Sequence, residues 1–393
     1  MVSAASRPSV GRPGVSDAGV RFNHRVPSTD PPAISWDQVL AWRLRRQSLD
    51  PLGEESTVEI ARRLCGIQAQ VASAAELAVA VRQQQAAPGQ VERALIDERT
   101  LIRTWAMRGT LHLLPVEEAG AYLALSGAHR KWETGSWQKA FGATPADLEA
   151  IAAAATDALD ATATLTRDEL TQEIVDRTGS AHLRAVLGSG WGTLLKPLAW
   201  RGVLCHGPAQ GNRVTFTSPR RWVSGWPDVP DPDEAAPVAV RAYLRAHGPG
   251  SPDTFDAWLS RGLSPRRKLK GWFTALADEL SPVDVEGTTL QFLAEDLDDL
   301  LATQPTDLVR MVGGFDQYVL GAGTNATYLV PAEHRSDVSR TGGWISPVVL
   351  HGGRVVGTWR ADGAIEVSLW GDVPAKALKQ ETARIQELLD STS

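Results

Sequence analysis

The segment RTWAMRGTLHLLP, residues 103–115, predicts a β-hairpin that turns at Arg108-Gly109. Strand periodicity places Arg108, Thr110 and His112 on one face of the hairpin and two leucines on the other. The chain before the hairpin has apolar residues at helical spacing, which predicts helices over residues 37–47, 57–65, 73–84 and 91–97. The order is therefore helices followed by a two-stranded hairpin.

The same order recurs twice along the chain. The second copy has helices over 147–159, 166–179 and 189–202, and then a hairpin of residues 203–206 and 213–217. The third copy has three helices within 235–280 and a hairpin over 281–293. Helices followed by a two-stranded wing are typical of the winged helix-turn-helix, and three in tandem predict a scaffold that handles DNA.

The remaining chain is rich in predicted strands. Residues 306–371 alternate and contain Gly-Gly turns, which predicts a small antiparallel barrel or sheet, and a final helix is expected over 375–389. We therefore predict an α+β fold with three tandem winged helix-turn-helix units and a C-terminal, barrel-like β-rich segment. The expected boundaries are a disordered tail over 1–35, winged units over 36–116, 117–230 and 231–300, and the β-rich segment over 301–393.

Composition excludes several classes of protein. The 393 residues are 43% hydrophobic and 22% charged, which is typical of a globular protein. No apolar run is long enough for a transmembrane helix, and the N-terminus lacks a signal-peptide core, so a cytoplasmic location is expected. Cys65 and Cys205 are too few for a disulfide framework. Since no metal-ligand spacing and no glycine-rich phosphate loop occur, we predict no metal and no cofactor.

The segment LCGIQAQVAS, residues 64–73, interrupts an otherwise helical pattern. Gly66 predicts the end of one helix, and Ser73-Ala-Ala-Glu76 is a capping box that predicts the start of the next. Gln68 and Gln70 therefore lie on a short connection. If that connection is extended, the two side chains point the same way and both amides face one spot.

Six blocks of sequence resemble one known family. They are IQAQ (67–70), TWAMRGTLHLLP (104–115), LLKPLAWRGVLCHGP (194–208), VTFTSPRRW (214–222), GFDQYVLG (314–321) and WISPVVLHGGRVVGTWR (344–360). In this order they resemble the AlkZ/YcaQ superfamily of winged-helix DNA glycosylases, from about residue 36 onward. The resemblance implies a curved protein that embraces DNA, with Gln68 and Gln70 as its catalytic motif. With glutamine at the second position of this motif, the chain resembles the AlkZ branch of the superfamily, which is associated with unhooking interstrand crosslinks.

Two amides suit a particular kind of leaving group. Neither glutamine titrates near pH 7, so neither is an ordinary general acid or base. An N7-alkylated guanine already has a positive charge, so it leaves without a proton, and the enzyme has only to position water and stabilise an oxocarbenium-like state. We therefore expect a monofunctional DNA glycosylase that excises bulky N7-alkylpurines, including crosslinked ones, in DNA repair or in self-resistance to a genotoxin.

Other positions have two interpretations each. Arg108, Thr110, His112, Lys196 and Arg201 are candidates for DNA contact, although each could equally be a solvated polar residue. Asp316 could support the site or cap a turn. The net charge of −6 argues against nucleic acid, but basic clusters such as residues 43–46 and 266–270 make DNA binding compatible. The expected partner is damaged double-stranded DNA, bound by a monomer that does not associate with membranes; the alternative is a non-enzymatic winged-helix transcriptional regulator.

Overall fold

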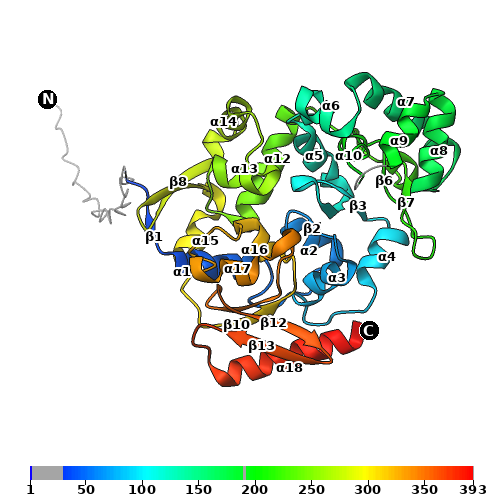
Figure 1. Ribbon diagram of the computed structural model, residues 1–393. Helices are drawn as coiled ribbons and strands as arrows, with labels where there is room; N and C mark the ends of the chain where they lie inside the picture. Colours follow the sequence, from blue (N-terminus) through cyan, green and yellow to red (C-terminus); the bar gives the residue numbers. More distant parts are fainter. Residues whose placement is uncertain (2–29, 189–191, 393) are drawn as a thin grey trace.

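The computed structural model describes residues 1, 30–188 and 192–392, and it has a mixed α+β fold (Figure 1). Most of the expected N-terminal tail, and the start of the helix expected over 189–202, lie outside the described residues. Two residues of that tail form strand β1 (Ala33–Ile34), which pairs in parallel with β8 (Leu280–Val285). The ordered fold therefore begins before residue 36. Among the described helices, none is long and apolar enough to cross a membrane.

The first predicted hairpin is present. Its strands are antiparallel, with Leu101 opposite Pro115 and Trp105 opposite Leu111. The helices before it also form, and α2 begins at a capping box in which Ser56 and Glu59 bond each other's backbone N–H groups. The elements of this segment are α1 (Trp36–Arg46), α2 (Thr57–Arg63), β2 (Ile67–Gln68), α3 (Ala72–Ala80), α4 (Gln90–Ile96), β3 (Leu101–Trp105), the 3-10 turn η1 (Met107–Gly109) and β4 (Leu111–Pro115).

Helix α1 packs against elements outside the unit to which the sequence assigned it. Trp42 and Val39 are buried against residues of the third hairpin, including Phe292. The indole Nε1 of Trp42 donates to Asp299 at 3.0 Å, and Arg45 forms an ion pair with the same carboxylate. The predicted helix is correct, but long-range packing places it beside the third segment.

The second hairpin joins the first in one sheet. Arg103 of β3 pairs with His206 of β6, and the strand order is β2-β4-β3-β6-β7-β5. The helix predicted over 166–179 is present as α8, which begins at a capping box formed by Thr166 and Glu169 and ends at the left-handed Gly179. The elements are α5 (Val116–Gly127), η2 (Lys131–Glu133), α6 (Gly135–Phe141), α7 (Pro145–Ala161), β5 (Leu165–Thr166), α8 (Arg167–Thr178), α9 (Ala181–Gly188), α10 (Lys196–Trp200), β6 (Cys205–His206), β7 (Thr215–Thr217) and α11 (Pro219–Trp222).

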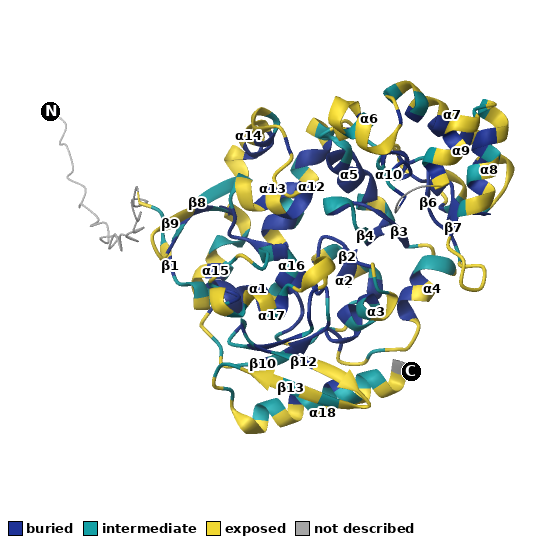
Figure 2. Cartoon of the chain, in the orientation of Figure 1, coloured by how far each residue is buried: buried dark blue, intermediate teal, exposed yellow. Residues whose placement is uncertain are grey.

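The third segment shares its core with the first two. A single cluster buries Leu114 of the first hairpin, Tyr122 of α5, and Trp258 and Phe273 of the third segment. The predicted helices and hairpin are present as α12 (Pro232–His247), α13 (Pro252–Ser260), α14 (Arg266–Thr274), β8, β9 (Thr288–Leu293) and α15 (Leu297–Ala302). Figure 2 shows the buried residues of α5, α12 and α13 facing one another at the centre of the molecule.

The C-terminal segment forms an open sheet and not a barrel. Its strands follow the antiparallel order β10-β11-β12-β13, so within the described chain the two outer strands do not close on each other. Two stretches expected as strands are different: residues 317–322 form helix α16, and residues 325–331 form turns. The elements are β10 (Val309–Val312), α16 (Gln317–Ala322), α17 (Arg335–Val338), β11 (Val348–His351), β12 (Arg354–Asp362), β13 (Ala364–Leu369) and α18 (Ala375–Thr392).

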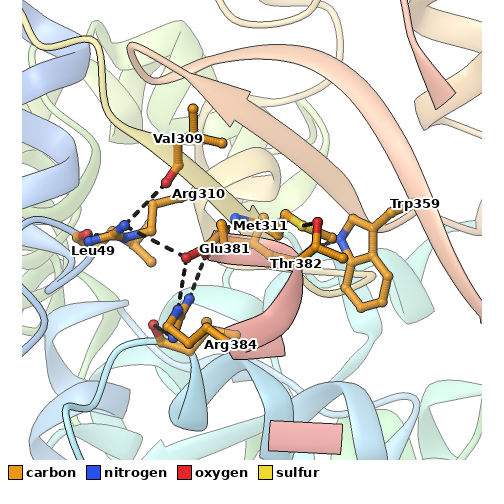
Figure 3. A network of polar contacts seen from close by, with 10 residues as sticks. Leu49, Val309, Arg310, Met311, Trp359, Glu381, Thr382 and Arg384 are labelled. Atoms are coloured by element: carbon orange, nitrogen blue, oxygen red, sulfur yellow. Dashed lines mark hydrogen bonds and ion pairs between the residues drawn. The ribbon is translucent and has the colours of Figure 1, made fainter. Parts of the chain in front are cut away.

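The final helix is fastened to this sheet and to the first segment through Glu381. Its carboxylate accepts the backbone N–H of Met311 at 2.9 Å and forms ion pairs with Arg310 and Arg384 (Figure 3). Arg310 also donates to the carbonyl of Leu49 at 2.7 Å. These bonds hold the C-terminal sheet against the segment that contains the glutamine pair.

Candidate active site

The connection that holds the glutamine pair leaves helix α2 through two residues with positive φ. Cys65 has φ 57° and Gly66 has φ 89°, and the N–H of Gly66 bonds back to Ala61 at 2.8 Å. A Cβ on Gly66 would lie 2.7 Å from Leu114, so glycine suits both the backbone and the space. The chain then enters strand β2, where Gln68 pairs with His112. The prediction that the pair lies outside regular helix is confirmed.

The predicted capping box downstream is wrong. Helix α3 begins at Ala72, its N-cap is Val71, and no side chain caps it. Glu76 instead accepts the N–H groups of Gln90 and Val91 at 2.9 and 3.1 Å. These donors open helix α4, whose N-cap is a glycine without a capping side chain, so the carboxylate of Glu76 satisfies them from the neighbouring helix.

The two glutamines have different surroundings. Gln68 is 6% exposed, whereas Gln70 is exposed. Oε1 of Gln68 accepts a hydrogen bond of 3.2 Å from Nη2 of Arg108, and no hydrogen bond to the Gln70 side chain occurs within the described structure. One amide is therefore fixed by the fold, and the other is available to a ligand.

Arg108 occupies a strained turn between three parts of the fold. Its φ is 58° in the left-handed region, inside η1. Besides Gln68, it donates to the carbonyl groups of Trp258 in α13 and Leu320 in α16, both at 3.4 Å. Burial, with repulsion from Arg261 as a smaller cause, lowers the pKa of Arg108 to about 10. No carboxylate in the described chain pairs with this guanidinium.

His112, which its polar strand face suggested as a DNA contact, is buried. It is 0% exposed, and it lies between Gln68 and Thr104 in one row across β2, β4 and β3. Its Nδ1 donates to the carbonyl of Thr110 at 3.0 Å, which leaves Nε2 as an acceptor without a partner. Burial, then Arg108, lowers the pKa of His112 to about 3, so the ring is neutral.

The other three candidates for DNA contact, Thr110, Lys196 and Arg201, have different neighbours in the structure. Thr110 bonds the carbonyl of Met107 at 3.1 Å and shapes the hairpin turn. Lys196 lies at the start of α10 beside Gly109, where an added Cβ would be 3.6 Å from its Nζ. Arg201 forms a bidentate ion pair with Glu149, so its charge is neutralised away from the hairpin. The structure thus brings Lys196, but not Arg201, to the turn that contains Arg108.

Comparisons with known proteins identify the family. Residues 61–388 match the family model described as DNA glycosylase AlkZ-like. The chain belongs to the AlkZ-like DNA glycosylases. It is 48% identical over 358 residues to an interstrand DNA cross-link repair glycosylase of Streptomyces sahachiroi. The aligned residues make up 89% of this chain and 95% of that protein. The solved structure of S. sahachiroi DNA glycosylase AlkZ superimposes with a TM-score of 0.86 at 46% identity, covering 90% of this chain and 97% of that one.

As an AlkZ-like glycosylase, this protein has a site built of neutral polar groups and one cation. Oε1 of Gln68 has two lone pairs, of which Arg108 uses one. The second can accept a hydrogen bond from water. No carboxylate in the described residues bonds to Gln68, Arg108 or His112. No group of His, Cys, Asp or Glu side chains in the described chain is arranged to hold a metal ion.

Asp316 fixes the start of helix α16. It forms a fully buried, bidentate ion pair with Arg82 at 2.7 and 2.8 Å, and it caps α16 by accepting the N–H of Tyr318 at 2.8 Å. The capping role foreseen as the alternative is therefore observed. Because α16 also contains Leu320, whose carbonyl accepts from Arg108, the ion pair fixes one wall of the site.

Sequence reasoning missed Thr104. It is 0% exposed, lies opposite His112 and has an Oγ1 without a partner. Pairing the two strands around the Arg108-Gly109 turn would have placed Thr104 opposite His112, but the sequence does not show that the face they share is buried.

Proposed function

We propose that this AlkZ-like glycosylase hydrolyses the N-glycosidic bond of N7-alkylpurines in double-stranded DNA, including purines crosslinked to the opposite strand. The observation that supports it is the pair formed by Gln68 and Arg108, with no carboxylate bonded to either. Such a site has no acid to protonate a normal purine, so it suits a base that is already cationic. The crosslink repair stated in the name of the S. sahachiroi relative agrees with this substrate.

The reaction is a displacement by water. Oε1 of Gln68, polarised by Arg108, and the amide of Gln70 accept the hydrogens of a water molecule and orient its oxygen toward C1′. The C1′–N9 bond breaks, and its electron pair neutralises the positive imidazole ring of the departing base. The new C1′–O bond forms as the water loses its proton to solvent. The products are a neutral N7-alkylpurine and an abasic site, without strand cleavage.

The scaffold of the proposed enzyme consists of three winged helix-turn-helix units, over 36–116, 117–230 and 231–300, and a β-rich segment over 301–393. Each unit has helices followed by a hairpin, as this motif requires. The shared six-stranded sheet and common core support a single rigid body that grips one duplex as a monomer. Two buried cysteines that form no disulfide are consistent with a cytoplasmic enzyme.

Crosslinked substrates limit how the base is reached. A base tied to the opposite strand cannot rotate into a deep pocket, as the substrates of base-flipping enzymes do. In our proposal the connection with Gln68 and Gln70 instead brings water to the sugar from the groove. The exposed side chain of Gln70 supports that approach.

The test is incubation of the purified protein with a duplex that contains one N7-alkylguanine, and with one that contains a defined N7 crosslink. Free base, alkali-labile strands and unhooked crosslink should appear, and undamaged purines should stay intact. Gln68→Ala and Gln70→Ala should bind the duplex and release little base. If the protein released only small monoadducts, or if both variants unhooked crosslinks at the parental rate, the proposal would be wrong. A tight complex with an undamaged palindrome, without base release, would instead favour a regulator.

A further inference from the structure

A pocket of about 380 Å³ is lined by Arg108 and Gly109 of the hairpin turn. Its walls come from all three helix-and-hairpin segments: the turn η1, helices α5 and α10, and the end of α13 (Figure 1). We call it the hairpin pocket. Its lining includes Arg108, Ser126, Lys131, Lys196, Trp200 and Arg261.

The charges of the hairpin pocket are of one sign. Arg108, Lys131, Lys196 and Arg261 line it, and no Asp or Glu is found among its described lining residues. Burial, together with Arg261, lowers the pKa of Lys196. None of these four cations has an ion-pair partner in the described chain, unlike Arg201 nearby. Cations held together without a counterion favour an anion between them.

Two uncharged polar groups of the pocket have no hydrogen-bond partner among the described residues. Ser126 is 4% exposed, yet its Oγ is one of them. The buried indole Nε1 of Trp200 is the other. Buried donors are normally paired, and an unpaired one costs free energy comparable to a lost hydrogen bond. A ligand with several acceptor oxygens would satisfy both donors and the charges at once.

The backbone presents two of the cations rigidly. Arg261 has φ 63° at the end of α13, and Arg108 has φ 58° in the hairpin turn. Left-handed non-glycine residues are strained, and they persist where surrounding structure fixes them. Lys196 lies directly beside Gly109, since a Cβ there would be 3.6 Å from Nζ and 3.8 Å from Cδ. The side chains are therefore arranged before any ligand arrives.

We infer that the hairpin pocket binds one internal phosphodiester of the substrate strand. This phosphodiester is next to the target nucleotide, toward whose C1′ Gln68 orients water. This inference rests on the proposed function, because the ligand belongs to the same DNA. Arg108 belongs both to the pocket and to the hydrogen bond with Gln68. Binding of the phosphate therefore fixes the guanidinium that orients the catalytic amide, which makes Arg108 a positioning residue.

The experiment compares Lys196→Gln, Arg261→Gln and the double variant with Lys379→Gln, an exposed lysine of α18 in another part of the molecule. Binding is measured over a range of salt with a duplex whose target nucleotide has a fluorinated sugar that resists hydrolysis. Each pocket variant should weaken binding by roughly tenfold and reduce the slope of log K against log salt by about 1. Lys379→Gln should change neither, and thermal unfolding should show that all variants are folded.

A neutral methylphosphonate, moved one linkage at a time along the substrate strand, identifies the phosphate. With the parental protein, one internal linkage near the target should weaken binding most. In the double variant, a methylphosphonate at that linkage should have little effect on binding. Methylphosphonates at the other linkages should weaken binding as they do with the parental protein. If no linkage loses its effect in the double variant, the inference is wrong. It is also wrong if inorganic phosphate or a 5′-terminal phosphate competes for the pocket as strongly as the duplex does.

Failure of the inference and failure of the proposed function give different results. The binding experiment needs no catalysis, so a linkage effect that depends on Lys196 and Arg261 would support the pocket even if no N7-alkylpurine were released. Release of the base by a protein whose pocket variants bind like the parent would instead support the function and overturn the pocket.

Discussion

The guanidinium of Arg108 donates a hydrogen bond of 3.2 Å to Oε1 of Gln68, although the two residues are 40 positions apart in the chain. Because arginine only donates, the amide atom that faces it must be the oxygen. The Nε2 group of Gln68 is then directed elsewhere, and one lone pair of Oε1 remains for water. The first hairpin thus sets the orientation of the Gln68 amide, the proposed catalytic group, on the neighbouring strand.

Arg108→Ala should reduce base release through this bond. A hydrogen bond to a charged group contributes about 1.5–3 kcal/mol, which corresponds to a rate roughly 10- to 100-fold lower if the bond acts in the transition state. Arg108→Lys should recover part of the rate, since an ammonium can still donate to Oε1. The measurement is single-turnover release of N7-methylguanine at saturating protein, with binding measured separately.

The double variant with Gln68→Ala tests whether the two residues act together. If Arg108 acts through Gln68, adding Arg108→Ala to Gln68→Ala should cost little further rate. Fully additive losses would contradict the positioning role and leave Arg108 as an independent DNA contact.

Much of the local structure was predictable, because it depends on local rules. The hairpin at Arg108-Gly109, the helices over 57–65 and 166–179, and the connection after Gly66 follow from periodicity and turn chemistry, and all are observed. The capping box at Ser73 failed because Glu76 reaches the start of another helix, which only tertiary structure reveals.

The candidate site was only partly predictable for the same reason. Alternation correctly grouped Thr110 with His112, but the pattern cannot distinguish a solvated polar face from one that other segments cover. His112 proved to be completely buried, and Arg108 contacts α13 and α16, which are more than a hundred residues away in the chain. Family resemblance pointed to Gln68 and Gln70 as candidates, whereas their unequal exposure required the fold.

Buried histidines should make the protein less stable in acid. An unfolded histidine takes up a proton near pH 6.5, whereas burial lowers the pKa of His112, His206 and His247 to about 3. At a pH between about 3 and 6.5 the unfolded state binds more protons than the folded state does. The stability that comes from keeping these rings neutral is therefore complete above about pH 7 and is lost as the pH falls through 6.5. Each histidine should lower the free energy of unfolding by up to about 1.4 kcal/mol per pH unit.

The test variant is His206→Phe. Neither ring nitrogen of His206 has a partner, and the ring packs against Trp105 and Phe216, so phenylalanine should fit. In urea unfolding at pH 5 to 8, the variant should lose less stability in acid than the parent does. Equal pH dependence in the two proteins would show that His206 is not held neutral by the fold.

Asp316→Asn should destabilise the protein strongly. Asp316 and Arg82 are both 0% exposed, and the substitution leaves a buried guanidinium without its counterion. Breaking such a pair costs about 3–5 kcal/mol. The control is Glu366→Gln, which removes a solvent-exposed ion pair with Arg360 and should cost at most about 1 kcal/mol. Urea unfolding of the three proteins gives the comparison, and similar losses for both variants would contradict the structural role of Asp316.

Alanine substitutions at the glutamine pair should separate stability from catalysis. Gln68→Ala removes a buried acceptor of Arg108 and should lower the free energy of unfolding by about 1–3 kcal/mol. Gln70→Ala alters an exposed side chain and should change it by no more than about 0.5 kcal/mol. Both variants should nevertheless lose most base release, because the proposed water needs both amides. Chemical unfolding and single-turnover excision measure the two effects on the same preparations. Full excision by Gln70→Ala would remove Gln70 from the catalytic pair, and an equal loss of stability in both variants would contradict the unequal burial on which this prediction depends.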